Sequence, residues 1–345
     1  MNWINSSKLE KMELKLTDKT EGMPKDRNSL IKITKEIPLI GHIAFGLILR
    51  GSNLIQVRPT TLCNLRCPFC STASNDPNIH STDYEVEPDY LIKTIKEVVN
   101  FKECNNTEIN IDSVGEPLMY PKLTYLIKEI KKIPQVKKIS MQTNGTLLTK
   151  DNIKQLEQAG LNHINLSIHT LDEKQAKELS GNSNYDIKKI LNLLKEIEID
   201  LWLTPVWIPN INDKEIIKII QLAKSLNLRL GIQKYEIYKY SRKMKKAKKI
   251  NYYKFYKKLS EWEKEFNVKL KIGPSDFNIQ RTKKLPPVFK KGEKLQATTK
   301  LPGWFKNQTI AIARNRTITI NKKLPLNKKI NIKILQNKNN IYLAN

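Results

Sequence analysis

Three cysteines lie close together in the segment VRPTTLCNLRCPFCSTAS, with three residues between the first two and two residues between the last two. They are Cys63, Cys67 and Cys70, and they follow an apolar run that is typical of a strand. A loop this short can bring three thiolates to one four-iron four-sulfur (4Fe-4S) cluster, whereas a protein that closes off such a cluster normally supplies four. The spacing therefore predicts a 4Fe-4S cluster with one iron open to an external ligand.

Alternatively, these cysteines could bind a zinc ion. Structural zinc takes a closed tetrahedral set of Cys and His side chains, usually in paired short spacings. His80 could complete such a set, but no second pair follows and the spacing is uncommon for zinc. The iron-sulfur interpretation is therefore favoured.

Strand-like segments alternate with helical patterns in the middle of the chain. The strands are expected at 54–60, 108–115, 138–145, 163–170, 201–208 and 228–236. Amphipathic helices are expected at 89–101, 122–133, 150–159, 186–199 and 213–226. Each crossover is long enough for a right-handed parallel connection. The pattern predicts an α/β fold of six βα units.

These strands alternate polar and apolar residues, unlike the continuous apolar runs of a sheet buried on both faces. Asn110 and Asp112, for example, oppose Ile109 and Ile111, and the next strands repeat the alternation. Because helices must cover the apolar face, the polar face should line an open interior such as the lumen of a partial barrel. Ligands of such folds bind at the carboxyl ends of the strands, where the cysteine loop begins.

With this architecture, residues 54–275 resemble the radical S-adenosylmethionine (SAM) superfamily, which binds SAM at the open iron of a three-cysteine cluster. The phenylalanine before the third cysteine resembles that family's loop. Val114-Gly115-Glu116-Pro117 resembles its Gly-Gly-Glu motif, with valine in place of the first glycine. The resemblance implies a partial (βα)6 radical SAM barrel with these SAM contacts: Phe69, Gly115, Glu116, Asn144, Ser167, Val206 and Ile208.

The same resemblance implies roles for those residues. Glu116 would receive the SAM amino group, Asn144 and Ser167 would hold the ribose and the carboxylate, and backbone at 206–208 would flank the adenine. Two residues after Ser167, many relatives have an acid where this chain has His169, which leaves that ribose contact open.

The resemblance further implies reductive cleavage of SAM, in which the cluster gives one electron to the sulfonium and a 5'-deoxyadenosyl radical abstracts hydrogen from the substrate. It implies an electron donor such as a ferredoxin or flavodoxin. The substrate-facing candidates come from the polar face, and no catalytic role can be assigned among them: Gln142, His169, Gln233 and Tyr235.

The length of 345 residues suits one barrel-sized domain plus a small module. We expect an extension at 1–53 packing on the barrel, the core at 54–275, a linker at 276–287 and a small barrel at 288–345. The longest apolar stretch, 37–49, is shorter than the roughly 20 residues that span a bilayer, so no membrane partner is expected. Four cysteines do not form a disulfide framework, which favours a cytoplasmic protein.

Positive charge is concentrated toward the C-terminus. The formal net charge is +27, and the residues from Arg281 onward contribute +15 of it, with 16 Lys or Arg against the single acid Glu293. A codon bias toward lysine would spread the charge evenly, so the distribution indicates a polyanionic partner. A second basic run, Lys239–Lys249, has seven Lys or Arg in eleven residues and could form a rim for that partner.

The segment from about Val288 contains short alternating strands and no helical pattern, which predicts a small all-β, OB-like barrel. Its leading KKGE, central hairpin and KLPLNKKINIKIL resemble the TRAM domain of RNA-modifying enzymes. The resemblance implies RNA as a partner, bound mainly through phosphates. Trp304 and Phe305 could stack on a base or form an apolar corner of the barrel.

Cysteine counting narrows the chemistry. No cysteine precedes Cys63 and none follows Cys104, so a second cluster has no ligands, and methyl transfer through a pair of further cysteines is excluded too. Cys104 is expected to be a buried structural thiol. The sequence thus predicts a single-cluster radical SAM enzyme acting on tRNA or rRNA. Two alternatives stay open, namely a peptide, protein or small metabolite as substrate, and a metal-binding RNA-binding protein without enzymatic activity.

Overall fold

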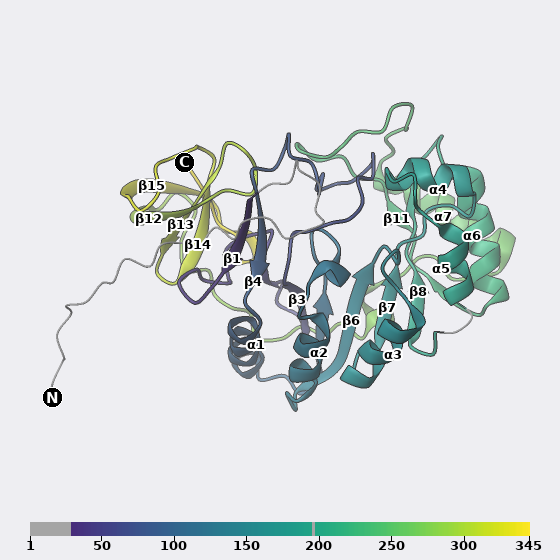
Figure 1. The fold of residues 1–345 in the computed structure, drawn as a ribbon, viewed down its shortest axis with the longest axis horizontal. Helices are drawn as coiled ribbons and strands as arrows, with labels where there is room; N and C mark the ends of the chain where they lie inside the picture. Colours follow the sequence, from purple (N-terminus) through teal and green to yellow (C-terminus); the bar gives the residue numbers. More distant parts are fainter. Residues whose placement is uncertain (1–28, 195–196) are drawn as a thin grey trace.

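The computed structural model describes residues 29–194 and 197–345. Figure 1 shows an α/β body with a smaller β-barrel beside it, and the purple strand β1 and the blue strand β4 lie between the two. This arrangement confirms the predicted class, an α/β fold followed by a small closed barrel. Among the described residues, no helix is long and apolar enough to cross a membrane.

The α/β body is built on a seven-stranded sheet in the order β10-β8-β7-β6-β5-β3-β2. Six of its strands are parallel, as predicted, and the edge strand β2 (Gly46–Leu49) pairs antiparallel with β3. The parallel strands are β3 (Leu54–Arg58), β5 (Thr107–Ile111), β6 (Val136–Thr143), β7 (His163–Leu166), β8 (Asp200–Leu203) and β10 (Arg229–Leu230). Past β8 and β10 the chain bends and forms a second parallel pair, β9 (Val206–Trp207) and β11 (Gln233–Lys234).

Helices cover the apolar face of this sheet (Figure 1). They are α1 (Pro88–Lys102), α2 (Leu123–Lys131), α3 (Lys150–Ala159), α4 (Glu173–Ser180), α5 (Ile187–Leu193) and α6 (Asp213–Ser225). Helix α7 (Tyr252–Phe266) packs Phe255 and Trp262 against Trp207 of β9, and it borders a cavity that Gln142 and Gln233 of the polar face also line. Short 3₁₀ turns are η1 (Pro117–Met119), η2 (Pro274–Phe277) and η3 (Lys338–Asn340). The helix predicted at 186–199 ends at Leu193, and residues 195–196 of that prediction lie outside the described residues.

The alternation in the strands has the predicted consequence. Ile109, Ile111 and Met141 are fully buried under the helices. On the other face, the Asn110 amide donates to Ser140 Oγ (2.9 Å), so polar side chains of neighbouring strands satisfy each other within the interior. The lumen is therefore polar and can hold water and ligands.

The N-terminal segment builds part of the structure. Strand β1 (Ser29–Ile33) pairs in parallel with β4 (Thr82–Val86), and β2 extends the main sheet. The first 28 residues of the extension predicted at 1–53 lie outside the described residues. The segment predicted as a linker at 276–287 is fixed along the body, because Asn53 exchanges backbone and side-chain hydrogen bonds with Gln280.

The C-terminal barrel closes in the order β12-β13-β14-β16-β15, with the fifth strand between the third and the fourth. This is a five-stranded Greek-key arrangement of the kind found in oligonucleotide-binding folds. Its core is a separate apolar cluster that includes Phe289, Ile318 and Tyr342. The strands are β12 (Lys294–Pro302), β13 (Thr309–Ala313), β14 (Arg316–Ile320), β15 (Lys329–Gln336) and β16 (Leu343–Ala344).

The barrel is packed tightly against the N-terminal segment. Gly41 has φ +134°, its carbonyl accepts from Tyr342 N (3.0 Å), and a Cβ on it would lie 2.0 Å from Thr317 O. Only glycine allows this approach of two backbones. The barrel is therefore held to the α/β body by backbone contacts.

Candidate functional site

A cavity of about 350 Å³ lies at the carboxyl ends of the parallel strands. This volume is within the range of small-molecule sites. It brings together most of the residues singled out from the sequence, namely Cys63, Cys67, Phe69, Cys70, Gly115, Glu116, Gln142, Asn144, Ser167, His169, Val206, Gln233 and Tyr235. Of the predicted set, only Ile208 does not line it. Ile208 is fully buried beside the cavity, and its amide donates to Asn212 Oδ1 (2.7 Å).

The three cysteines suit a multi-iron cluster better than a single metal ion. They lie half-buried, and burial raises the pKa of the Cys63 thiol far above its usual value and that of Cys67 to about 12. Thiolates at these positions therefore need a cationic partner such as iron. Within the described part of the chain, no three His, Cys, Asp or Glu side chains converge as one ion would require. A tetrahedral zinc ion holds its sulfurs only about 2.3 Å from the metal, whereas a cluster binds each cysteine to a different iron.

His80 is not a fourth ligand. Its Nε2 lies 2.9 Å from the carbonyl of Thr72, and its ring is stacked on Trp304 with centroids 4.3 Å apart. Among the described residues, His80 and the cysteines do not converge on one metal position, so the structure gives no support to the zinc alternative that used His80.

The cysteine loop is held by Arg242, which the sequence placed in a basic run. Its backbone amide donates to Cys70 O (3.0 Å), and its guanidinium donates to Cys67 O (2.9 Å), Ala73 O (3.1 Å) and Ser74 O. The planar guanidinium can serve several carbonyls at once because its donors are fixed in a fork. This network fixes the backbone between and after the last two cysteines.

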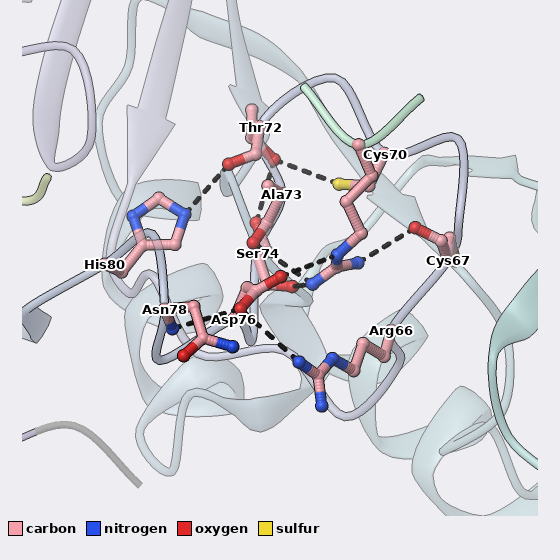
Figure 2. A network of polar contacts seen from close by, with 10 residues as sticks. Arg66, Cys67, Cys70, Thr72, Ala73, Ser74, Asp76, Asn78 and His80 are labelled. Atoms are coloured by element: carbon pink, nitrogen blue, oxygen red, sulfur yellow. Dashed lines mark hydrogen bonds and ion pairs between the residues drawn. The ribbon is translucent and has the colours of Figure 1, made fainter. Parts of the chain in front are cut away.

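Asp76 balances the charge of that guanidinium. Its Oδ2 pairs with Arg242 Nε (3.3 Å), and its Oδ1 pairs with Arg66 (3.4 Å) and accepts from Asn78 N (3.1 Å). Figure 2 shows Asp76 between Arg66 and the carbonyls of the loop. Burial alone would raise the pKa of Asp76, but the hydrogen bonds from Asn78 and Arg242 outweigh it and hold the pKa below its usual value. Asp76 is therefore a charged anchor at ordinary pH.

Glu116 stands between the motif segment and the end of β6. It is buried, and its carboxylate accepts from Thr143 Oγ1 (2.7 Å), Asn144 N (2.8 Å) and Leu118 N (3.1 Å). Burial raises its pKa to about 7, and these donors oppose the rise. A carboxylate has about four acceptor positions, so one remains for a ligand in the cavity.

Gly115 is required by the cysteine loop. A Cβ on Gly115 would lie 2.1 Å from Leu62 O and 2.5 Å from Thr61 O. The next amide, Glu116 N, donates to Leu62 O (2.7 Å). Val114 stands in place of the expected first glycine, and its backbone carbonyl accepts from Thr72 Oγ1 (3.1 Å). The motif therefore packs the end of β5 against the backbone that carries Cys63.

His169 positions the wall of the cavity. Its Nδ1 accepts from Val206 N (3.1 Å), so the other ring nitrogen carries the proton. Burial lowers the pKa of His169 to about 4, which keeps the ring neutral. Phe69 contacts it edge to face, with centroids 4.8 Å apart. The pair joins the cysteine loop to the start of β9.

The remaining candidates differ in how free their polar groups are. Tyr235 is buried and its hydroxyl accepts from Met244 N (3.1 Å), so it supports the loop after β11. Asn144 donates to Asn64 of the cysteine loop (3.0 Å). In the described part of the chain, the side chains of Gln142, Gln233 and Ser167 make no hydrogen bond or ion pair, which leaves these groups available to ligands.

The C-terminal barrel reaches the site through Trp304 and Phe305. Trp304 is buried against His80, and Phe305 stacks on His80 (5.0 Å) and on Tyr240 (4.0 Å between centroids). Trp304 is thus not available to stack on a base, and it packs in the apolar core of the α/β body rather than in the core of the barrel. These rings form the contact between the barrel and the cysteine loop.

Sequence reasoning missed several residues of the site. Arg242 gave no signal, because it stands among exposed lysines. Asp112 lines the cavity and pairs with Arg58 (3.2 Å), and its place on the polar face was the only hint. Cys104 was expected to be buried, but it is only half-buried, since it lies in the turn after α1 rather than under a helix.

Comparisons with known proteins agree with the geometry. The sequence model of the Radical SAM superfamily matches residues 57–223. The uncharacterized protein MJ0103 of Methanocaldococcus jannaschii is 40% identical over 349 residues, which cover 92% of this chain and 81% of that protein. The GTP 3',8-cyclase of Clostridium perfringens is 32% identical over 178 residues, 50% of this chain and about half (52%) of the cyclase. The crystal structure of Streptococcus suis SuiB bound to precursor peptide SuiA has a similar fold, with a TM-score of 0.51 at 19% identity over 67% of this chain and 52% of SuiB.

Proposed function

Since this chain belongs to the Radical SAM superfamily, whose enzymes use a 4Fe-4S cluster and SAM, we propose that its substrate is RNA, delivered to the cavity by the basic C-terminal barrel. The class of RNA that we favour is tRNA or rRNA. The enzyme class follows from the family. The substrate is our inference from charge, fold and the position of the barrel.

We assign the cluster to Cys63, Cys67 and Cys70, which line the cavity together. SAM would then lie against Glu116 and Ser167, with the Phe69 and His169 rings as one wall. When bound, the cluster and SAM supply a 5'-deoxyadenosyl radical, which abstracts hydrogen from the substrate. The chain's own task is orientation and exclusion of water.

The protein residues perform that task in distinct ways. Arg242 and Asp76 hold the cysteine loop in one conformation. Glu116, whose pKa burial raises to about 7, places its carboxyl group at the point where a ligand ammonium would bind. Gln142 and Gln233 have free amides that face the cavity and could hydrogen-bond a substrate.

The observation that carries the RNA proposal is a like-charged pair on the barrel. Lys294 of β12 and Lys333 of β15 stand directly opposite each other in the antiparallel register, and both are exposed. Like charges directly opposite each other on neighbouring strands destabilise a sheet. A phosphate that lies across the pair would relieve this repulsion.

The relatives suggest rival substrates. One matched protein is named as a GTP cyclase and one solved structure holds a peptide. The net charge of the C-terminal barrel and its five-stranded order suit a nucleic acid instead. A small metabolite or a peptide is therefore the outcome to test against.

The test measures RNA affinity of the full chain across a salt series. Lys294→Gln combined with Lys333→Gln should weaken binding and reduce the log-log salt slope by about 0.7, since the one phosphate that lies across the pair contributes about 0.7 on a single strand. Lys154→Gln combined with Lys189→Gln, two exposed lysines on the α/β body, is the matched control. RNA should also stimulate release of 5'-deoxyadenosine. Equal affinities in all three proteins, or stimulation by a peptide or nucleotide instead, would refute RNA as the substrate.

A further inference from the structure

One segment of the α/β body combines aromatic and basic residues in an unusual way. Residues 238–258, here called the tyrosine-lysine segment, contain five tyrosines, ten Lys or Arg and no acid. Surfaces that bind single-stranded nucleic acid combine basic side chains with exposed aromatic rings, as this segment does. A basic loop that is only solvated would not need exposed tyrosine rings between its lysines.

The tyrosines of this segment are on the outside of the fold. Tyr253 is 75% exposed, Tyr238 is 61% exposed and Tyr256 is 46% exposed. The apolar face of α7 is formed by other side chains, since Phe255 and Trp262 are buried. The ring of Tyr256 contacts those of Tyr252 and Phe255, with centroids 6.1 and 5.3 Å apart, and the rest of its surface is exposed to a partner, as are Tyr238 and Tyr253.

The segment borders the cavity that contains the cysteines. Tyr238 lines that cavity, and its turn is fastened to the cysteine loop because Ser241 Oγ donates to Ser71 O (2.9 Å). Tyr256 lines a second cavity of about 270 Å³, which shares Gln142 and Gln233 with the first. Tyr238 and Tyr256 thus border two cavities that share Gln142 and Gln233 of the polar face.

The same segment contacts the C-terminal barrel. Tyr240 stacks on Phe305, with centroids 4.0 Å apart and an interplanar angle of 24°. An RNA strand bound to the barrel near Phe305 could therefore continue along the tyrosine-lysine segment and then reach the cavity.

We propose that the tyrosine-lysine segment binds unpaired nucleotides of a single-stranded RNA, with bases stacked on Tyr238, Tyr253 and Tyr256 and phosphates neutralised by the lysines between them. The proposal rests on the RNA function proposed above and names where that RNA meets the cavity. Single-stranded RNA is the favoured occupant because flat exposed rings take base faces, which a duplex hides. Tyr252 is left out, since the Lys234 ammonium already lies 4.8 Å from its ring centroid.

The experiment uses the full chain and a single-stranded RNA of about a dozen nucleotides that carries 2-aminopurine, whose fluorescence falls on stacking. Replacing Tyr238, Tyr253 and Tyr256 together with alanine should weaken binding at least fivefold, because loss of one stacked base alone costs about 1 to 3 kcal/mol. The quenching should be lost with it. The salt slope should stay unchanged, since tyrosines neutralise no phosphate.

Two variants serve as controls. Replacing the same three tyrosines with phenylalanine keeps the rings and should keep both affinity and quenching. Tyr125→Ala removes an exposed tyrosine from α2, away from the segment, and should change neither. Circular dichroism on each variant excludes misfolding.

The outcomes separate the two proposals. If the barrel lysine variant binds RNA more weakly while the three alanines leave affinity and quenching intact, the RNA function stands and the tyrosine-lysine segment is not its binding site. If the unaltered chain binds no RNA at any salt concentration, both proposals fail. Equal loss of affinity in the phenylalanine and alanine variants would also overturn the stacking proposal.

Discussion

Arg242→Lys is the substitution that tests most directly how the cysteine loop is held. It keeps the positive charge and changes only the geometry of the donors. The guanidinium of Arg242 serves three carbonyls and the carboxylate of Asp76, and both side chains of that ion pair are only 12% exposed. A lysine ammonium has three donors at one point and cannot reach partners on both sides of the fork.

The expected loss follows from these contacts. Hydrogen bonds that involve a charged group contribute about 1.5 to 3 kcal/mol each, and they are not additive within one network. Full removal of one partner from a buried ion pair costs about 3 to 5 kcal/mol. Because lysine retains the charge and some of the bonds, we expect a loss of about 1.5 to 3 kcal/mol in the stability of the loop.

Hydrogen exchange measured by mass spectrometry reports this loss locally. The amides of Cys70, Ala73 and His80 are bonded within the loop, to Cys67 O, Cys70 O and Asp76 O. Their exchange should become about tenfold to a hundredfold faster in Arg242→Lys, since 1.4 kcal/mol is a factor of ten. The iron content after anaerobic reconstitution should fall in parallel.

Lys243→Gln is the matched control, because it removes a charge from the neighbouring position, which is exposed. It should leave exchange and iron content unchanged. If Arg242→Lys exchanges like the unaltered chain, or if Lys243→Gln shows the same acceleration, the guanidinium does not hold the loop and the reasoning is wrong.

Three further outcomes are expected. Replacing any one of the loop cysteines with alanine should abolish both the broad cluster absorption and SAM cleavage, because a three-thiolate site has no spare ligand; retained cleavage in two of the three variants would contradict the cluster assignment. Glu116→Gln should weaken SAM binding by about 1.5 to 3 kcal/mol in calorimetry and leave the absorption intact. Burial raises the pKa of Glu116 from 4.5 to about 7, so the free energy of unfolding of the SAM-free protein should fall as the pH rises from 4.5 to about 7. The free energy of unfolding of Glu116→Gln should lack this pH dependence. Phe305→Ala should cost about 2 kcal/mol, since two stacked pairs are lost, and should speed amide exchange at His80; exchange that stays slow would show that the barrel does not support the loop.

The sequence could predict the parts of this fold that depend on periodicity. Alternation in the strands identified the six parallel strands and the polar lumen, because period two determines which side chains share a face. The cysteine spacing identified the loop. Helix α4 was missed because it is short and its apolar residues are few, so its capping by Asp172 and Gly181 was the only local signal.

Long-range contacts could not be predicted in the same way. Nothing in KYSRKMKKAKK distinguishes Arg242, which is folded onto the cysteine loop, from Lys243, which is exposed. Strand β1 pairs with β4 across about fifty residues of sequence, and neither strand has a partner nearby in the chain that would reveal the pairing. The role of Trp304 also depended on a contact with His80, more than two hundred residues away in sequence.

The packing of the barrel determines how RNA binding can be tested. Deleting residues 286–345 would expose His80, and it would remove the carbonyl of Pro302 that accepts from the buried Tyr84 hydroxyl (2.6 Å). Loss of a partner from a buried polar group costs about 1 to 3 kcal/mol, so the truncated chain would lose stability near the cysteine loop as well as any RNA site. Reduced SAM cleavage after deletion would therefore not show that RNA binding matters. Exposed lysines such as Lys294 and Lys333 avoid this difficulty, because their removal changes the charge of the barrel and leaves its contact with the loop in place.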